Sequence, residues 1–249
     1  MSFSQSLATH FPNALPAELF VRRTYEALWR LGFVKANTFA GIGLCRDELT
    51  RPLAEEIEKT WGEAFNFSGL AGMLYLGKAG FTASLHHAPD EEGSTRHVYF
   101  ALPHIGIMPD GRIGLCNRPG QLKPSPACGA LVAFLNELTT GSIRVNLDMD
   151  DIELSLLKQR LIPKLQYGQV PELVALTKIA QTAIREDLER LILLTLGPSH
   201  NHYAVLSGIQ IHGPQQQTFV WPCEPYAVVD GVRHPITLPS PSPVELGID

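Results

Sequence analysis

Hydrophobic residues recur at helical spacing in the first part of the chain. Residues 16–32 carry them on one face, between an initial proline and a final glycine, so this segment is predicted to form a helix. A short apolar run over 38–44 is typical of a buried strand, and it ends at Cys45. A second helix is expected over 48–65.

The middle of the chain contains further apolar runs. Residues 68–85 are apolar and rich in glycine, which predicts a short helix or loop followed by a strand that runs into His86 and His87. Residues 97–102 form the clearest strand pattern in the sequence. That strand leads directly to His104.

The remaining segments complete the pattern. A helix is expected over 127–138, two long helices over 150–197, and two antiparallel strands over 203–212 and 217–229. Strands alternate with helices through the first 140 residues, which favours an α/β fold with a central sheet flanked by helices.

Length and composition fit a globular protein. A chain of 249 residues suits one α/β domain or two small ones, and we expect a single domain over 1–249 with irregular tails at 1–15 and 236–249. The hydrophobic fraction of 45% provides ample material for a core.

Charge and targeting signals exclude several classes of partner. The net charge is −5 and the sequence has no long basic run, so nucleic acid is not an expected partner. The N-terminus has no secretory pattern, and the most apolar helical stretch is too short to span a bilayer. Four scattered cysteines are typical of an intracellular protein. We therefore expect a cytoplasmic protein without membrane contacts.

Three residues with metal-ligating side chains are predicted to meet at one edge of the sheet. Cys45 and His104 follow strands, and Cys128 falls in the first turn of a helix, where helix N–H groups favour a thiolate. Zinc suits two thiolates and one imidazole, and three protein ligands leave a fourth position for water. Cys116 or His86 as a fourth ligand would close such a site.

Charged residues directly follow Cys45. A carboxylate at Asp47 can reach the open position of a metal bound by Cys45, and the adjacent Arg46 could hold that carboxylate through a paired hydrogen bond. The alternative interpretation is that Asp47 caps the next helix.

Adjacent histidines form the second cluster of chemically active side chains. Either His86 or His87 could replace His104 as a ligand or carry protons to buffer, and either could be structural. Neighbouring positions of a strand face opposite sides of the sheet, so at most one of the two is expected to face the site.

Five motifs along the chain are distinctive when taken together. They are CRDE at 45–48, GFTASLHHAPD at 80–90, PHIGIMPDGRIG at 103–114, RPGQ at 118–121 and ACGAL at 127–131. With this set of motifs, the chain resembles the limiting-CO2-inducible protein B family, β-carbonic-anhydrase-like proteins also described as θ-type carbonic anhydrases.

This resemblance implies a β-carbonic-anhydrase-like central sheet flanked by helices, usually in a homodimer. It implies a Zn²⁺ ion held by Cys45, His104 and Cys128, together with an aspartate–arginine pair that includes Asp47. The β-type motif places the arginine four residues after the first cysteine, where this sequence has Leu49. The candidates for the arginine are therefore Arg46 and Arg51.

The implied activity is reversible hydration of CO2 to bicarbonate by a zinc-bound hydroxide, so the chain is expected to be a carbonic anhydrase. The main alternative is an inactive zinc-binding homologue with a structural or bicarbonate-sensing role. A zinc hydrolase with a larger substrate and a cysteine-nucleophile enzyme built on Cys128 are further alternatives.

Overall fold

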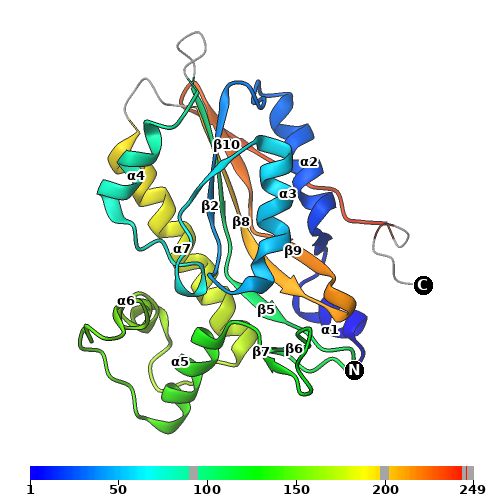
Figure 1. Cartoon of the computed structure of the whole chain (residues 1–249), viewed down its shortest axis with the longest axis vertical. Helices are drawn as coiled ribbons and strands as arrows, with labels where there is room; N and C mark the ends of the chain where they lie inside the picture. The colour runs from blue at the N-terminus through cyan, green and yellow to red at the C-terminus, as the bar shows by residue number, and fades with distance from the viewer. Residues whose placement is uncertain (90–94, 197–201, 243–244, 246–249) are drawn as a thin grey trace.

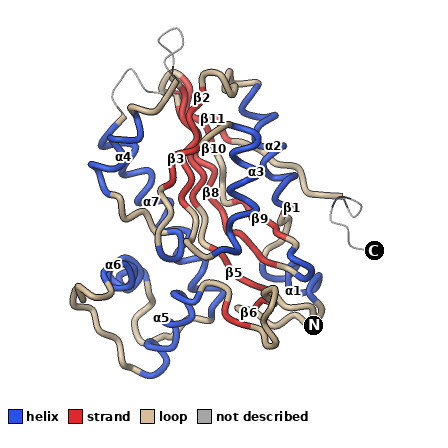
Figure 2. Tube along the Cα trace, in the orientation of Figure 1, coloured by secondary structure: helices blue, strands red, loops and turns tan. Residues whose placement is uncertain are grey.

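A mixed β-sheet runs through the computed structural model, which describes residues 1–89, 95–196, 202–242 and 245 (Figures 1 and 2). The described residues form a nine-stranded sheet. Its strands are β1 (Leu15–Pro16), β2 (Thr38–Gly43), β3 (Ala64–Asn66), β4 (Arg96–Ala101), β5 (His104–Gly106), β8 (Tyr203–His212), β9 (Thr218–Pro222), β10 (Tyr226–Val229) and β11 (Val232–Pro235). A separate ribbon pairs β6 (Leu115–Cys116) with β7 (Ser125–Pro126).

The central strands β3, β2, β4 and β8 are parallel, so their carboxyl ends share one edge of the sheet. Strand β5 continues β4 beyond Pro103 without a change of register, because Ala101 pairs with Ser207 and His104 pairs with Gln210. Strands β9 and β10 pair with β8 in the antiparallel direction.

Helices cover both faces of the sheet (Figure 1). The α-helices of the described residues are α1 (Phe3–His10), α2 (Ala17–Trp29), α3 (Arg51–Trp61), α4 (Gly77–Leu85), α5 (Gly129–Thr140), α6 (Ile152–Leu161) and α7 (Leu173–Thr195). Helices α2 and α3 lie on one face, and α4 and α7 lie on the other. This arrangement confirms the expected α/β fold with a sheet between helices.

Successive side chains along the central strands point to opposite faces of the sheet and so form two separate core layers. In β4, Val98 and Phe100 pack with α2 and α3, whereas Tyr99 and Ala101 pack with α4 and α7. Successive strand residues point to opposite faces, so a strand covered on both sides must be apolar throughout. The near-continuous hydrophobic run over 97–102 therefore follows from its central place in the sheet.

The chain begins with a helix, so the expected irregular tail at 1–15 is wrong. Ser2 and Gln5 form a reciprocal cap at the start of α1, in which the Ser2 hydroxyl oxygen accepts from the Gln5 amide at 3.3 Å. Phe3 and Leu7 are buried in a core cluster with residues of β5, β8 and β9. Residues 236–242 form no helix or strand.

The expected strand before His86 is also wrong, because residues 77–85 form helix α4. Phe81 and Ser84 are its buried residues, at the three-residue spacing of one helix face. A short apolar run with glycines does not distinguish a strand from a helix by pattern alone, and here packing against α7 selects the helix.

The segment expected as one strand over 217–229 is divided into β9 and β10 by a bulge. Gly208 pairs with Pro222 at the end of β9, and Val205 pairs with Tyr226 at the start of β10. Residues 223–225 therefore lie opposite residues 206–207 of β8, which is one residue more than regular pairing needs. Glu224, within the bulge, has a φ of 44°.

The expected long helices over 150–197 are present as α6 and α7. Helix α7 is the longest, but the charged residues along it leave it too polar to cross a bilayer, and the other helices in the described part of the chain are likewise unsuited to spanning one. Whether the whole chain is one domain stays a prediction.

Candidate metal centre

Three side chains expected to hold a metal lie together at the carboxyl edge of the parallel strands. Cys45 is two residues beyond β2, His104 begins β5, and Cys128 is the residue that immediately precedes α5. Their ligand atoms all lie within 4.8 Å of one another, and all three residues are buried. Loop ends at this edge of an open α/β sheet commonly form binding sites.

Gly106 allows Cys128 to approach the sheet. A β-carbon at Gly106 would lie 2.4 Å from the Leu115 carbonyl oxygen and 2.8 Å from the Ala127 β-carbon, so only glycine fits there. The Ala127 amide donates to the Gly114 carbonyl at 2.9 Å, which fixes the residue before Cys128. Cys128 itself has a φ of 62°, a left-handed conformation that is costly for a residue with a side chain.

His104 presents one ring nitrogen to the cluster and uses the other for support. Its Nδ1 lies 2.9 Å from Nε2 of His212, whereas its Nε2 is buried without a hydrogen-bond partner. Burial, followed by the nearby His104 and Arg118, holds the pKa of His212 well below its ordinary value. A neutral His212 can accept a hydrogen bond from Nδ1–H of His104, which leaves Nε2 of His104 free to bind a metal.

The unpartnered nitrogen and two thiols fit zinc in number and kind. A Cys₂His set with ligand atoms this close is a common donor set for Zn²⁺, and a buried polar atom without a partner is otherwise costly. The described residues therefore contain a Cys–His–Cys group that can hold a metal ion.

We expect His212→Ala to weaken zinc affinity by roughly tenfold to a hundredfold, because outer-shell partners of metal-bound histidines commonly contribute that much. Competition with a chromophoric chelator measures the affinity. His234→Ala is the matched control, since His234 lies in β11, opposite Ala227 of β10. Equal affinities of the two variants would contradict the supporting role of His212.

The two cysteines hold their protons differently. A hydrogen bond from Cys128 lowers the pKa of Cys45 against the opposing effect of burial, and His104 adds to the lowering. The same contact and burial raise the pKa of Cys128. The pair therefore favours one thiolate, on Cys45, with the proton retained by Cys128.

The metal-free protein is consequently expected to carry one thiolate at neutral pH, where an ordinary thiol is mostly protonated. Because the pKa of Cys45 is lowered, this thiolate persists as the pH falls below neutral. Thiolate ultraviolet absorbance followed during a pH titration measures it. The signal should vanish in Cys45→Ser and remain in Cys223→Ser, and its persistence in Cys45→Ser would contradict the assignment.

Asp47 lies beside the cluster and is held by an arginine from a distant segment. Its Oδ2 accepts from Arg118 at 2.8 Å and lies 4.0 Å from Nε2 of His104. Its Oδ1 accepts from the Leu49 amide at 3.1 Å, so the expected capping role is also present. Arg118 additionally donates to Glu48 at 2.6 Å.

The expected pairing of Asp47 with Arg46 or Arg51 is not what the structure shows. Arg46 points away from Asp47 to Glu153 of α6, and Arg51 pairs with Glu55 one turn along α3. Both side chains are mostly exposed, whereas that of Arg118 is only 14% exposed. Arg46, although adjacent to Asp47 in sequence, is directed at Glu153. The arginine that contacts Asp47 is Arg118, seventy-one residues further along the chain.

The other candidate ligands lie outside the cluster. His86 and His87 are exposed at the end of α4, and the His87 ring packs on Phe65 with a centroid distance of 5.4 Å. Cys116 is buried in β6, with its Sγ 3.7 Å from the Ser125 carbonyl oxygen. Within the described residues, neither histidine nor Cys116 joins the group that can hold a metal.

Two residues of this site, Arg118 and His212, were not identified from the sequence as functional residues. Arg118 begins the RPGQ motif in a predicted loop, and that motif was its only signal. His212 ends the apolar strand over 203–212 and so occupies the same kind of position as Cys45 and His104. A polar residue at the end of a buried strand was the signal that could have found it.

Comparisons with known proteins agree with this fold. The family model described as limiting CO2-inducible proteins B/C beta carbonic anhydrases matches residues 14–229. No curated protein matches the chain significantly.

Two solved structures are similar over nearly the whole chain. The limiting CO2-inducible protein LCIB is 37% identical, with 94% of this chain and 98% of that chain covered and a TM-score of 0.78. PtLCIB4, a homolog of LCIB, is 25% identical, with 94% and 100% covered and a TM-score of 0.80.

Proposed function

The chain belongs to the limiting CO2-inducible protein B/C family of β-carbonic anhydrases, and we propose that it binds one zinc ion and reversibly hydrates CO2 to bicarbonate. Cys45, His104 and Cys128 would hold the zinc. The observation that carries the proposal is the position of Asp47, which Arg118 holds 4.0 Å from the metal-facing nitrogen of His104.

Zinc bound by three protein ligands supplies an activated water at neutral pH, because the ion lowers the pKa of that water to about 7. The protein residues provide orientation. With Leu49 N–H on Oδ1 and Arg118 on Oδ2, Asp47 retains lone pairs that can accept a hydrogen bond beside His104. Such an acceptor would orient the attacking oxygen toward carbon.

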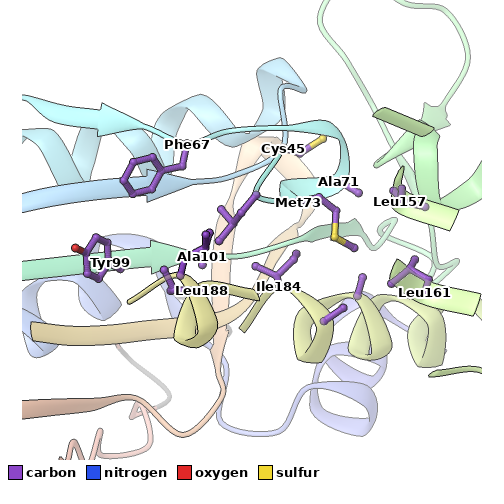
Figure 3. Close-up of a cluster of buried hydrophobic side chains, with 14 of the residues drawn as sticks. Cys45, Phe67, Ala71, Met73, Tyr99, Ala101, Leu157, Leu161, Ile184 and Leu188 are labelled. Carbon is purple, nitrogen blue, oxygen red and sulfur yellow. The ribbon is translucent and has the colours of Figure 1, made fainter. Parts of the chain in front are cut away.

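The surroundings of Cys45 suit a small uncharged substrate. Cys45 belongs to the same buried apolar cluster as Ala71 and Met73 (Figure 3), and apolar walls favour CO2 over water. A cleft of about 630 Å³ reaches Cys45 and Asp47, so a small substrate can approach these residues from solvent.

Stopped-flow CO2 hydration by the pure, zinc-loaded protein tests the proposal. We expect a rate well above buffer that scales with zinc content. A folded, fully zinc-loaded protein that hydrates CO2 no faster than buffer would contradict the proposed activity but not the proposed zinc site.

An inactive zinc-binding relative with a structural or bicarbonate-sensing role is the second candidate. The proximity of Asp47 favours it, because a carboxylate this close can itself become the fourth ligand and close the site. Azide added to Co²⁺-substituted protein separates the two. An open site changes its visible spectrum with azide, and a closed site does not.

We further propose that the protein is a homodimer, on the basis of the family resemblance. Light scattering coupled to size-exclusion chromatography gives the mass directly. A mass close to the 27.4 kDa of one chain at micromolar concentration would contradict this proposal.

A further inference from the structure

Helix α6 approaches the metal centre from outside the central sheet. Leu157 and Leu161 are fully buried in the same cluster as Cys45, Ala71 and Met73 (Figure 3). Glu153 precedes Leu157 by four residues, so the three side chains lie along one face of α6. That face ends in a carboxylate directed at the loops around Cys45.

The Glu153 carboxylate contacts two separate loops. Its Oε1 accepts from a guanidinium nitrogen of Arg46 at 2.5 Å, and its Oε2 accepts from the Leu70 amide at 2.9 Å. One side chain therefore uses both oxygens to join the segment that carries Cys45 to the segment that carries Leu70.

These two segments also pair with each other around Cys45. The Leu44 amide donates to the Ser68 hydroxyl at 3.2 Å, and Arg46 Nε donates to the Ser68 carbonyl at 3.4 Å. Cys45 and Gly69 form an isolated parallel bridge between these contacts. The Leu44 backbone and the Arg46 side chain, on either side of Cys45, are thus attached to Ser68, and Glu153 contacts both segments from α6.

We propose that Glu153 is a positioning residue of the metal centre, which holds the Cys45 loop in ligating geometry through Arg46 and Leu70. The inference rests on the proposed zinc site. It also assigns a use to Arg46, whose guanidinium faces Glu153 and not Asp47. Metal ligands supported by such outer contacts bind more tightly, because less ordering remains to be done on binding.

A competing explanation is that Glu153 only stabilises α6. It lies in the first helical turn, where the helix dipole favours a carboxylate. A role in the helix alone would lower thermal stability without changing metal affinity and without depending on Arg46. The partly exposed Arg46–Glu153 pair contributes little to global stability, so the two explanations predict different readouts.

Zinc affinity of Glu153→Gln, Arg46→Gln and the double variant tests the proposal by chelator competition. Glutamine keeps the shape and an acceptor for Leu70 but removes the ion pair. We expect each single variant to bind zinc roughly tenfold more weakly and the double variant to be no weaker than either. Glu186→Gln is the matched control, because it removes the ion pair of Glu186 with Lys164, away from this loop.

Hydrogen exchange of the metal-free proteins provides a second readout that needs no zinc. The Leu70 amide should exchange faster in Glu153→Ala, which removes both contacts, than in wild type or Glu186→Gln. In the Co²⁺-loaded proteins, the thiolate-to-metal absorption should shift in Glu153→Gln and in Arg46→Gln but not in Glu186→Gln.

Unchanged affinity and unchanged Leu70 exchange would overturn the proposal, as would additive losses in the double variant. Failure of wild type to bind zinc would overturn the proposed function, and with it the affinity claim. Exchange at Leu70 would still decide whether Glu153 holds the loop.

Discussion

The Cys45→Ala variant is expected to lose tight zinc binding and, with it, CO2 hydration above the buffer rate. Cys45 supplies one of the three ligand atoms of the cluster. Of the two cysteines, it is the one whose pKa is lowered, so it carries the thiolate. Loss of a directly bound thiolate should weaken zinc by more than the roughly hundredfold that loss of an outer-shell partner can cost. In this variant Cys128 loses its contact with Cys45, the largest cause of its raised pKa, and burial remains to raise that pKa.

Metal content after dialysis and stopped-flow hydration measure the two effects. Cys223→Ala is the matched control, since Cys223 lies in the bulge after β9 and outside the metal cluster. Circular dichroism should show that both variants fold. Full zinc occupancy in a folded Cys45→Ala protein would contradict the assignment of Cys45 as a ligand.

Removal of Arg118 is the second large expected effect, and it should separate catalysis from zinc binding. Arg118 donates to Asp47 and Glu48, and to the Pro126 carbonyl at 2.9 Å. Arg118→Ala leaves Asp47 without its partner beside His104. We expect hydration to slow by roughly a hundredfold to a thousandfold, the usual effect of losing one preorganised polar group. The zinc content should remain near that of wild type.

The controls compare the arginines that the sequence suggested with the one in the structure. Arg51→Ala removes an exposed arginine that pairs with Glu55, so activity should hardly change. Arg118→Lys keeps the charge but cannot contact Asp47 and Glu48 through one planar group, so it should recover only part of the rate. A larger loss in Arg51→Ala than in Arg118→Ala would contradict the Asp47–Arg118 assignment.

Elements with a long, uniform pattern were predicted well. The strand over 97–102 and the helix over 16–32 have patterns that local chemistry determines, and the structure contains both as β4 and α2. Residues 77–85 could not be assigned from the pattern, because a short apolar run fits strand and helix alike. The helix over 3–10 is short, and the Ser2–Gln5 cap is its sequence signal.

The metal cluster was largely predictable because parallel strands share a carboxyl edge. Once Cys45 and His104 are placed after neighbouring strands, topology alone brings them close together. Cys128 could be added because its family motif is recognisable and because a helix start suits a thiolate.

By itself, the sequence determined the α/β class, the strands that lead to Cys45 and His104, and the family. Only the tertiary structure decided that Arg118 holds Asp47, that His212 supports His104, and that Arg46 belongs to Glu153 of α6. Hydrophobic periodicity reports how each segment meets the core. It does not report which side chains from segments seventy-one or more residues apart meet, because chain packing sets those contacts.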